Sequence, residues 1–198
     1  MIDNNWHKKE KPMFSISGMG GGSFGQILAS AATDFNISRS LRFNNVGTDY
    51  ASHLKRTPSS PGNRRTFTYS CWVKRQALGA HNLLFQSGDN YFRFQNSDEI
   101  IFYTSGSTSV YTSALFRDIS AWYHVVLAVD TTQSTDTDRI KIYVNGTQHS
   151  LTAVGSLPSP SAELAINNNA VHYIGSNSTS SSEGLNAYLA EVNFIDGQ

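Results

Sequence analysis

The sequence predicts an all-β protein built as an antiparallel sandwich or barrel, and three observations carry this prediction. Apolar and polar side chains alternate with a period of two along many short segments after Ser40. Clusters of Ser, Thr, Asn and Gly separate these segments at close intervals. Aromatic residues make up 12% of the chain and charged residues only 15%, a mixture that favours short strands joined by polar turns. We see no convincing helical pattern after residue 38.

The clearest strand is predicted over residues 66–74. Its apolar side chains fall on one face, and Trp72 is the large residue on the opposite face. The residues expected to point into the core are Phe67, Tyr69, Cys71 and Val73. Cys71 is the single cysteine of the chain, so an intrachain disulfide is impossible, and its place in this pattern predicts a buried, unreactive thiol.

Further strands are expected on both sides of this one. Residues 122–129 are apolar at nearly every position, which predicts a strand in the middle of a sandwich with both faces apolar. Asn145-Gly146 predicts a type I′ hairpin between strands at 140–144 and 147–151, because both residues accept a positive φ. The remaining predicted strands are 41–43, 82–86, 91–94, 99–103, 172–175 and 187–195.

Residues 1–38 differ from the rest of the chain. They combine a charged patch, a glycine cluster and a run of small residues, without the periodicity that would build a core. Such a segment is either a disordered tail or an arm that orders against a partner. We favour the arm, because it carries six apolar residues that are costly to leave in water, namely Trp6, Phe14, Ile16, Phe24, Ile27 and Leu28. The predicted organisation is therefore an arm over 1–38 and a sandwich domain over 39–198.

Five ordered segments carry a resemblance to a known family: Ser40–Phe43, Arg65–Arg75, Trp122–Val126, Ile142–Gly146 and Tyr188–Val192. Together they resemble the laminin-G-like, concanavalin A-like jelly roll, in the version found in tail-fibre and other structural proteins of marine bacteriophages. The resemblance covers about residues 39–198 and implies a jelly-roll sandwich rather than a barrel. It is less specific for function, because this sandwich hosts lectins, adhesion modules, glycan hydrolases and structural proteins.

The phage resemblance also implies a location and partners. The protein is expected in the virion, as a tail fibre or capsid-surface appendage that binds other virion proteins through residues 1–38. The absence of a signal-peptide pattern in the sequence agrees with assembly in a host cytoplasm. A homo-oligomer is expected, with a trimer as the common state of phage fibres. The chain departs from the family in two ways. The family more often has a small residue at the position of Cys71. Similar chains also continue beyond the position of Gln198, so a longer native chain is left open.

Composition argues against two classes of partner. Fifteen basic residues balance fifteen acidic ones, so the chain lacks the positive field of a nucleic-acid-binding protein. No apolar run reaches the roughly 18 residues that a membrane-spanning helix needs.

The sequence also argues against catalysis. Glucanases of this fold carry carboxylates at alternate positions of one strand, as in Glu-x-Asp-x-Glu, and that spacing is absent. Asp98 and Glu99 are adjacent, so on a strand they would point to opposite faces. The glycine cluster at 20–25 matches hydrolase and dinucleotide-loop patterns, but the chain downstream lacks the α/β sheet that both require. We therefore predict a protein that is not an enzyme.

Calcium is the one cofactor that the sequence leaves open. Asp130, Asp136 and Asp138 flank a polar loop whose clustered oxygens are candidate calcium ligands. The alternative is a solvated turn in which Asp and Thr side chains cap backbone groups. The six histidines are scattered without ligand spacing, so zinc is not indicated.

Three functional hypotheses follow. The leading one is a non-catalytic virion structural protein, which could also face a host surface glycan. The second is the glycan-binding module of an adhesin or a secreted carbohydrate-active protein, with sugar held by aromatic and Asn-rich loops such as those around Tyr91 and Asn167–Asn169. The third, a polysaccharide hydrolase, is the one that the carboxylate spacing disfavours.

Overall fold

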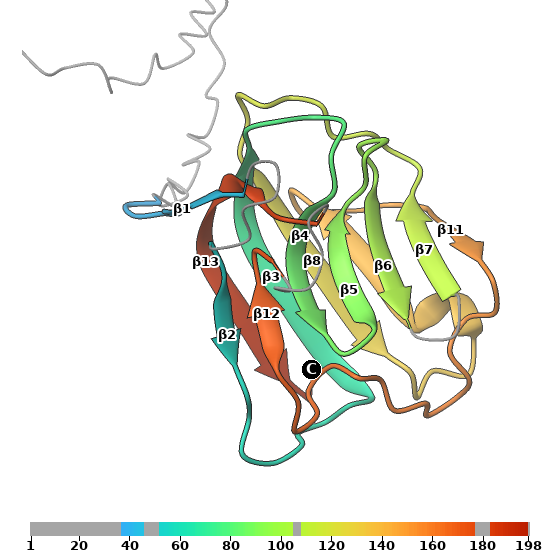
Figure 1. Ribbon diagram of the computed structural model, residues 1–198. Coiled ribbons are helices and arrows are strands. Elements are labelled where there is room, and N and C mark those ends of the chain that lie inside the picture. The colour runs from blue at the N-terminus through green and yellow to red at the C-terminus, as the bar shows by residue number, and fades with distance from the viewer. Residues whose placement is uncertain (1–36, 46–51, 105–107, 177–182, 198) are drawn as a thin grey trace, which may run out of the picture. The chain divides into compact units, whose positions relative to one another are not determined.

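Figure 1 shows a computed structural model of the protein, in which residues 37–45, 52–104, 108–176 and 183–197 are described. The chain divides into two units, residues 1–36 and residues 37–198. The six predicted anchor residues therefore lie outside the described residues. Within the part of the chain that the structure describes, no helix is long and apolar enough to cross a membrane.

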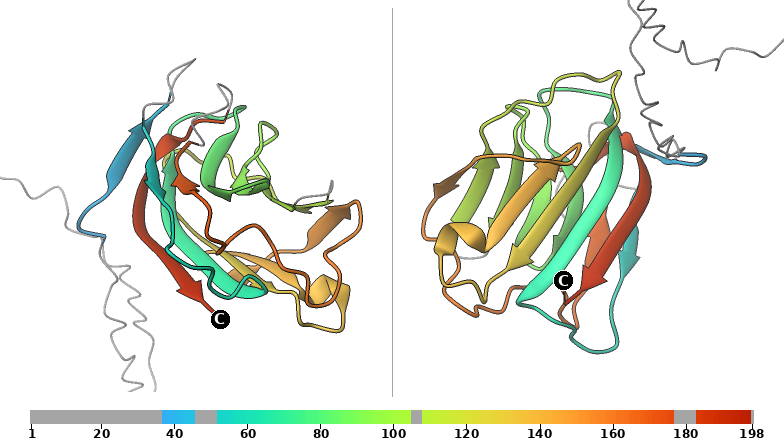
Figure 2. Two further views of the ribbon diagram at one scale, coloured as in Figure 1. Left: turned by 60° about the horizontal axis from the view of Figure 1, so that its bottom comes forward. Right: turned by 180° about the vertical axis from the view of Figure 1, so that it is seen from behind.

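Two antiparallel sheets form the domain, and Figure 2 shows them as facing layers. The first has six strands in the spatial order β1 (Leu41–Asn44), β13 (Asn186–Asp196), β3 (Thr66–Arg75), β8 (Tyr123–Asp130), β9 (Ile140–Val144) and β10 (Thr147–Gln148). The second has seven, in the order β11 (Leu151–Val154), β7 (Thr108–Thr112), β6 (Ile100–Thr104), β5 (Asn90–Phe94), β4 (Asn82–Ser87), β12 (His172–Ile174) and β2 (Leu54–Arg56). The structure confirms the predicted antiparallel sandwich; the alternative prediction of a barrel was wrong.

The core lies between the sheets, and β3 supplies its centre. The four residues predicted to point inward, from Phe67 to Val73, are fully buried, which confirms the assigned faces of this strand. Tyr69 stacks on Phe85 of the opposite sheet with ring centroids 4.8 Å apart. Cys71 is buried beside it, and burial raises the pKa of its thiol to about 12. The thiol therefore stays protonated at physiological pH, as an unreactive cysteine requires.

The strand predicted over 122–129, with both faces apolar, is observed as β8, and only one of its faces is fully buried. Residues of β8 alternate between buried and half-buried, and the half-buried ones point to the outer side of the six-stranded sheet. Among them, His124 stacks on Trp72 of β3 with ring centroids 5.0 Å apart. β8 does lie inside its sheet, between β3 and β9, but the second sheet covers only one of its faces.

The Asn145-Gly146 hairpin is confirmed, while the strand that follows it differs from the prediction. Both turn residues have positive φ, 52° and 79°. The predicted return strand 147–151 is divided between the sheets: β10 pairs with β9, and β11 pairs with β7. The chain crosses between them after His149, whose N–H still donates to Ile142 O, whereas Ser150 O accepts from Ser113 N.

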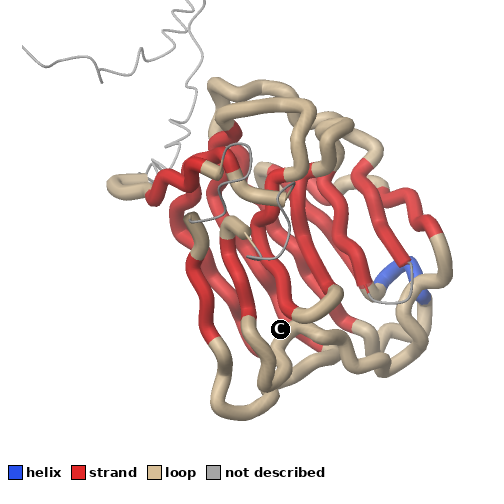
Figure 3. Tube along the Cα trace, viewed as in Figure 1, coloured by secondary structure: helices blue, strands red, loops and turns tan. Residues whose placement is uncertain are grey.

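Three short elements were not predicted. β2 has only three residues, all exposed, and β7 is rich in Ser and Thr, so neither shows an apolar alternation. One turn of 3-10 helix, η1 (Asp136–Asp138), is the blue segment in Figure 3. It lies in the Asp-rich loop and buries none of its residues, which explains why no helical periodicity marks it.

Asp98 forms a buried ionic cluster at the end of the sandwich. Its backbone φ is 78°, and it lies in the turn before β6, outside the strand predicted at 99–103. The carboxylate accepts hydrogen bonds from Arg75 Nη2 at 2.9 Å and from Arg117 Nε at 3.1 Å. Arg75 is fully buried, and its guanidinium lies 4.6 Å from the centre of the Phe94 ring. The pair ties β3 to the seven-stranded sheet.

Candidate functional site

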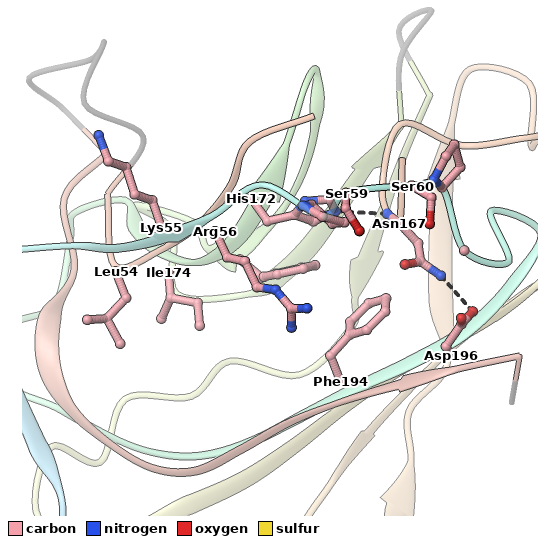
Figure 4. Close-up of a pocket in the computed structure, with 14 residues that line it drawn as sticks. Leu54, Lys55, Arg56, Ser59, Ser60, Asn167, His172, Ile174, Phe194 and Asp196 are labelled. Carbon is pink, nitrogen blue, oxygen red and sulfur yellow. Dashed lines mark hydrogen bonds between the residues drawn. The ribbon is translucent and has the colours of Figure 1, made fainter. Parts of the chain in front are cut away.

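The candidate site is a cavity at one open edge of the sandwich, where β2 and β12 of one sheet face β13 of the other. Figure 4 shows the side chains that line it. Its volume is about 580 Å³, within the usual range for a site that holds a small molecule. The loop at residues 58–62 closes one side. The cavity thus combines segments that are far apart in the sequence.

The inner wall of the cavity is aromatic. Phe85 of β4 is almost fully buried, while Phe194 of β13 remains 37% exposed. Their ring centroids lie 5.6 Å apart, and Phe194 also stacks on Phe67 at 5.6 Å. The cavity therefore offers part of an aromatic ring to a ligand, supported from behind by the core.

A bulge in β13 directs Phe194 inward. The register of β13 against β3 shifts between Ala190 and Asn193, so Phe194 pairs with the inward-pointing Tyr69. Glu191, inside the bulge, has a φ of 47°. Without the shift, strict alternation from Leu189 would turn Phe194 to the outer face, because side chains alternate along a strand.

Asn167 organises the polar wall. Its side-chain Nδ2 donates to Asp196 Oδ1 at 2.6 Å and to Asn63 O at 3.1 Å, and its backbone O accepts from Gly62 N at 2.8 Å. Asn167 has a φ of 63°, a conformation that Asn tolerates better than most residues. Gly62 has no room for a side chain, since a Cβ there would lie 2.4 Å from Asn167 Nδ2.

His172 is held in its neutral form beside this wall. Its Nε2 accepts the backbone N–H of Asn167 at 2.9 Å, so Nδ1 carries the proton that is donated to Ala170 O at 2.9 Å. Burial lowers the pKa of His172; the bond to Ala170 raises it, and the positive charge of Arg56 lowers it again. The net shift is downward, which is consistent with a neutral ring that accepts the Asn167 N–H.

Arg56 brings a positive charge to the cavity. Side chains alternate along β2, so Leu54 and Arg56 point toward the opposite sheet and Lys55 points away, as Figure 4 shows. No ion pair or hydrogen bond joins the Arg56 side chain to any other described residue. An aromatic ring, a hydrogen-bonded polar wall and an available guanidinium thus meet in one cavity.

A second hollow of about 670 Å³ continues along the same edge. It lies between β1, β2, β12 and the bulge of β13, and it shares Leu54 and Ile174 with the first cavity. Its described lining is mainly apolar and includes the charged residues Arg39 and Glu191.

The two sequence regions proposed to hold a sugar do not come together. Tyr91 lies on the outer face of the seven-stranded sheet, stacked on Tyr103 at 4.7 Å, with the Arg93 guanidinium 4.3 Å from its ring centre. Arg93 also forms an ion pair with Glu183. Asn167 instead lines the edge cavity, and the exposed Asn169 donates to Ser59 O at 3.3 Å.

Most residues of the cavity could not be predicted from the sequence. Of the cavity residues, only Asn167 in the Asn-rich loop was named from the sequence as part of a possible sugar site. Arg56 lies on an unpredicted strand, and Phe194 depends on a bulge that the alternation does not reveal. Asp196 is the last residue of β13, and in the sequence it follows the predicted strand without any pattern that marks it as a site residue.

The structure does not gather the three calcium candidates into one cluster. Among the described residues, no three His, Cys, Asp or Glu side chains are placed to hold a metal ion. Asp130 instead accepts from Thr132 N at 2.9 Å and from Gln133 Nε2 at 2.5 Å, as the turn alternative requires. Asp138 pairs with Lys141 at 3.4 Å. Calcium binding stays a prediction.

A buried cation already organises this loop. Arg139 is only 5% exposed, and its guanidinium donates to three backbone carbonyl oxygens, each at 2.8 Å. They belong to Gln133, Ser134 and Pro158. Carbonyl oxygens of this kind are also typical calcium ligands, so Arg139 occupies oxygens that could otherwise coordinate a metal.

The fold and the edge cavity define a lectin-like sandwich domain. The chain belongs to the concanavalin A-like lectin/glucanases superfamily, whose laminin-G-type family profile matches residues 46–198. This confirms the laminin-G-like and concanavalin A-like assignment made from the five sequence segments. No curated protein matches the sequence.

Solved structures share the fold at low sequence identity. A heptameric SAP-like pentraxin from Limulus polyphemus has a TM-score of 0.56 and 12% identity over 77% of this chain and 73% of its own. A protein from Bacteroides ovatus described as carbohydrate binding has a TM-score of 0.57 and 16% identity over 80% of this chain and 45% of its own. A Trypanosoma rangeli sialidase, seen with the inhibitor DANA, has a TM-score of 0.52 and 16% identity, but the match spans 79% of this chain and only 25% of the sialidase.

Proposed function

We propose that this domain is a carbohydrate-binding module that holds a sugar in the edge cavity. The observation that carries the proposal is the partly exposed Phe194 ring beside the wall formed by Asn167 and Asp196. Protein sites for small ligands combine an apolar surface with a few fixed polar groups, and a sugar ring presents the matching apolar face and hydroxyl groups. The membership of the chain in a superfamily that includes lectins, and the likeness to a Bacteroides protein described as carbohydrate binding, support it.

The cavity offers separate positions for the parts of a sugar. The ring would lie against Phe194, and its hydroxyl groups would reach the Ser59 and Ser60 side chains in the loop that closes the cavity. Asp196 would accept a further hydroxyl, because a carboxylate offers more acceptor positions than the two bonds that Asn63 N and Asn167 Nδ2 make to its Oδ1.

Binding without hydrolysis is part of the proposal. Glycosidases of the common kind flank the scissile bond with two carboxyl groups. Among the described residues that line the cavity, Asp196 is the one carboxylate, and two N–H donors fix its Oδ1. The sialidase likeness covers a quarter of that enzyme at 16% identity and is a likeness of fold alone.

A glycan array followed by calorimetric titration tests the proposal. We expect saturable binding of at least one glycan, weakened by Phe194→Ala because the ring surface is lost. Val154→Ala is a matched control, since Val154 is exposed on β11 at the opposite edge of the seven-stranded sheet. Loss of binding in Tyr91→Ala with full binding in Phe194→Ala would move the site to the outer face of that sheet. Absence of binding to every glycan would overturn the function.

The resemblance of five sequence segments to phage structural proteins favours a second, compatible proposal. In it, the domain belongs to a bacteriophage particle, in a tail fibre or surface appendage, as a homo-oligomer that is attached to other virion proteins through residues 1–38. A deletion of residues 1–38 should leave a folded β domain that no longer enters particles. Normal incorporation of the shortened protein would overturn the anchoring role.

A further inference from the structure

We propose that the edge cavity selects sugars that carry a carboxylate group, and that Arg56 recognises the charge. This inference rests on the proposed carbohydrate-binding function and names the ligand class. Its basis is the placement of one guanidinium beside an aromatic ring in a cavity of about 580 Å³.

Arg56 is the one arginine among the residues that line the edge cavity, and it differs from most described arginines in what it contacts. Arg39, which lines the second hollow, likewise has no ion pair or hydrogen bond to a described residue. Five described arginines form ion pairs with a carboxylate, and these are Arg64, Arg65, Arg75, Arg93 and Arg117. Arg139 binds three backbone carbonyls, and Arg42 binds side-chain amide oxygens. The guanidinium of Arg56 has no such partner among the described residues. It remains available to an anion that enters the cavity.

The position of Arg56 is set by the sheet rather than by a mobile loop. β2 pairs with β12, and Arg56 lies opposite His172 in this register. Its side chain therefore points between the sheets, while Lys55 points to the outer side (Figure 4). The neutral His172 adds no second charge beside it. Of the two basic residues that line the cavity, Arg56 and Lys55, Arg56 is thus the one whose charge is directed toward Phe194 (Figure 4).

Asp196 forms no ion pair with Arg56. Its Oδ1 is held by Asn63 N at 2.7 Å and by Asn167 Nδ2 at 2.6 Å. In the view of Figure 4 the Phe194 ring lies between the two side chains. A ring-shaped ligand over Phe194 would turn its carboxylate toward Arg56 and its hydroxyl groups toward Asp196, because the opposite orientation would place two carboxylates together.

The guanidinium also favours a carboxylate by shape. Its planar fork donates two parallel N–H bonds to the two oxygens of a flat carboxylate. Two kinds of sugar provide that group on a ring, namely uronic acids and sialic acids. Both are included in the test, because the same contact would serve either.

Calorimetric titration of the full chain tests the inference. The probes are an oligogalacturonate, sialyllactose, and the neutral lactose and cellohexaose. At low salt, we expect one acidic probe to bind at least about tenfold more tightly than its neutral counterpart, as a charge-assisted bidentate contact allows. Arg56→Gln should remove that preference, and Arg56→Lys should keep part of it. Lys55→Gln should keep the preference because, although Lys55 is among the residues that line the cavity, its side chain points away from Arg56 and Phe194 (Figure 4).

The outcomes separate this inference from the proposed function. Equal binding of acidic and neutral probes to the wild-type protein would overturn carboxylate selection and leave sugar binding standing. Equal losses in Lys55→Gln and Arg56→Gln would show a diffuse charge effect and overturn the role of Arg56. Tighter binding of a sulfated galactan than of both acidic probes would overturn the selection of a carboxylate over other anionic groups. Failure of all probes, neutral ones included, would overturn both proposals. Thermal melts of each variant confirm that it is folded.

Discussion

The side-chain Nδ2 of Asn167 donates a 2.6 Å hydrogen bond to Oδ1 of Asp196. Asn167 precedes β12 of the seven-stranded sheet, and Asp196 is the last residue of β13 in the six-stranded sheet. One amide group therefore joins the two layers at the edge where the cavity opens. Because the acceptor is a carboxylate, this bond is stronger than one between neutral groups.

Asn167→Gly should lower the free energy of unfolding by about 1.5–3 kcal/mol, the usual contribution of a hydrogen bond to a charged group. Glycine accepts the positive φ, so only the side-chain bonds are lost. Asn167→Ala should cost roughly 1 kcal/mol more, because alanine is strained at that φ. Urea denaturation measures both values. Asn169→Gly, at an exposed position, is the control, and an Asn167→Gly variant as stable as the wild type would contradict the role of this bond.

His172 should make stability depend on pH. Burial lowers its pKa in the folded protein below the unfolded value of 6.5. The unfolded chain therefore binds the proton more readily, and the contribution of His172 is complete above pH 6.5 and declines as the pH falls through the folded pKa. We expect His172→Gln to lose less stability than the wild type between neutral and acidic pH, as measured by urea denaturation at each pH. Identical pH profiles would exclude His172 as the titrating group.

Asp98→Asn should destabilise the domain strongly. The substitution leaves Arg75 fully buried without its counter-charge, and removal of one partner of a buried pair costs about 3–5 kcal/mol. Asp89→Asn, in the exposed turn between β4 and β5, should change stability by less than about 0.5 kcal/mol. Chemical denaturation compares the two. A small effect at Asp98 would mean that water or a rearranged side chain compensates Arg75.

Burial by itself raises the pKa of Asp98. Hydrogen bonds from Arg75, Arg117 and Gly79 N lower the pKa by more than burial raises it, so the net shift is downward. The stabilisation is therefore present above the unfolded pKa, near 3.8, and is lost only as the pH falls through the lower folded value. Wild type and Asp98→Asn should thus converge in stability in strong acid, whereas a constant difference at all pH values would contradict this account.

Arg139→Ala should loosen the Asp-rich loop. It leaves three carbonyl oxygens without their donor, and we expect a loss of about 2–3 kcal/mol in the free energy of unfolding. Lys141→Ala, which removes a partly exposed ion pair, should cost less than about 1 kcal/mol. Thermal melts with calcium and with a chelator test the predicted metal site in parallel. A calcium-dependent rise in the melting temperature that Asp136→Ala abolishes would establish that site.

The sequence alone was enough to predict the inward face of β3 and the Asn145-Gly146 turn. Both depend on local rules, since alternation places side chains on one of two faces and a positive φ selects Asn and Gly. It was not enough to place β11, because the transfer of the chain to the second sheet after His149 depends on which strand edge is free to pair.

The ionic cluster of Asp98 and the edge cavity depend on contacts between residues that are far apart in the sequence. Arg75 and Asp98 are 23 residues apart, and Asn167 donates to the backbone of Asn63 across 104 residues. Six of the eleven neighbouring strand pairs described in the two sheets are not consecutive in the chain, so local patterns indicate which way a side chain points but not which residues it contacts. The sequence by itself determined the class of fold and the faces of its main strands. Only the packing of the two sheets decided that Arg56, Phe194 and Asp196 share one cavity, because strand pairing and the bulge in β13 set their positions.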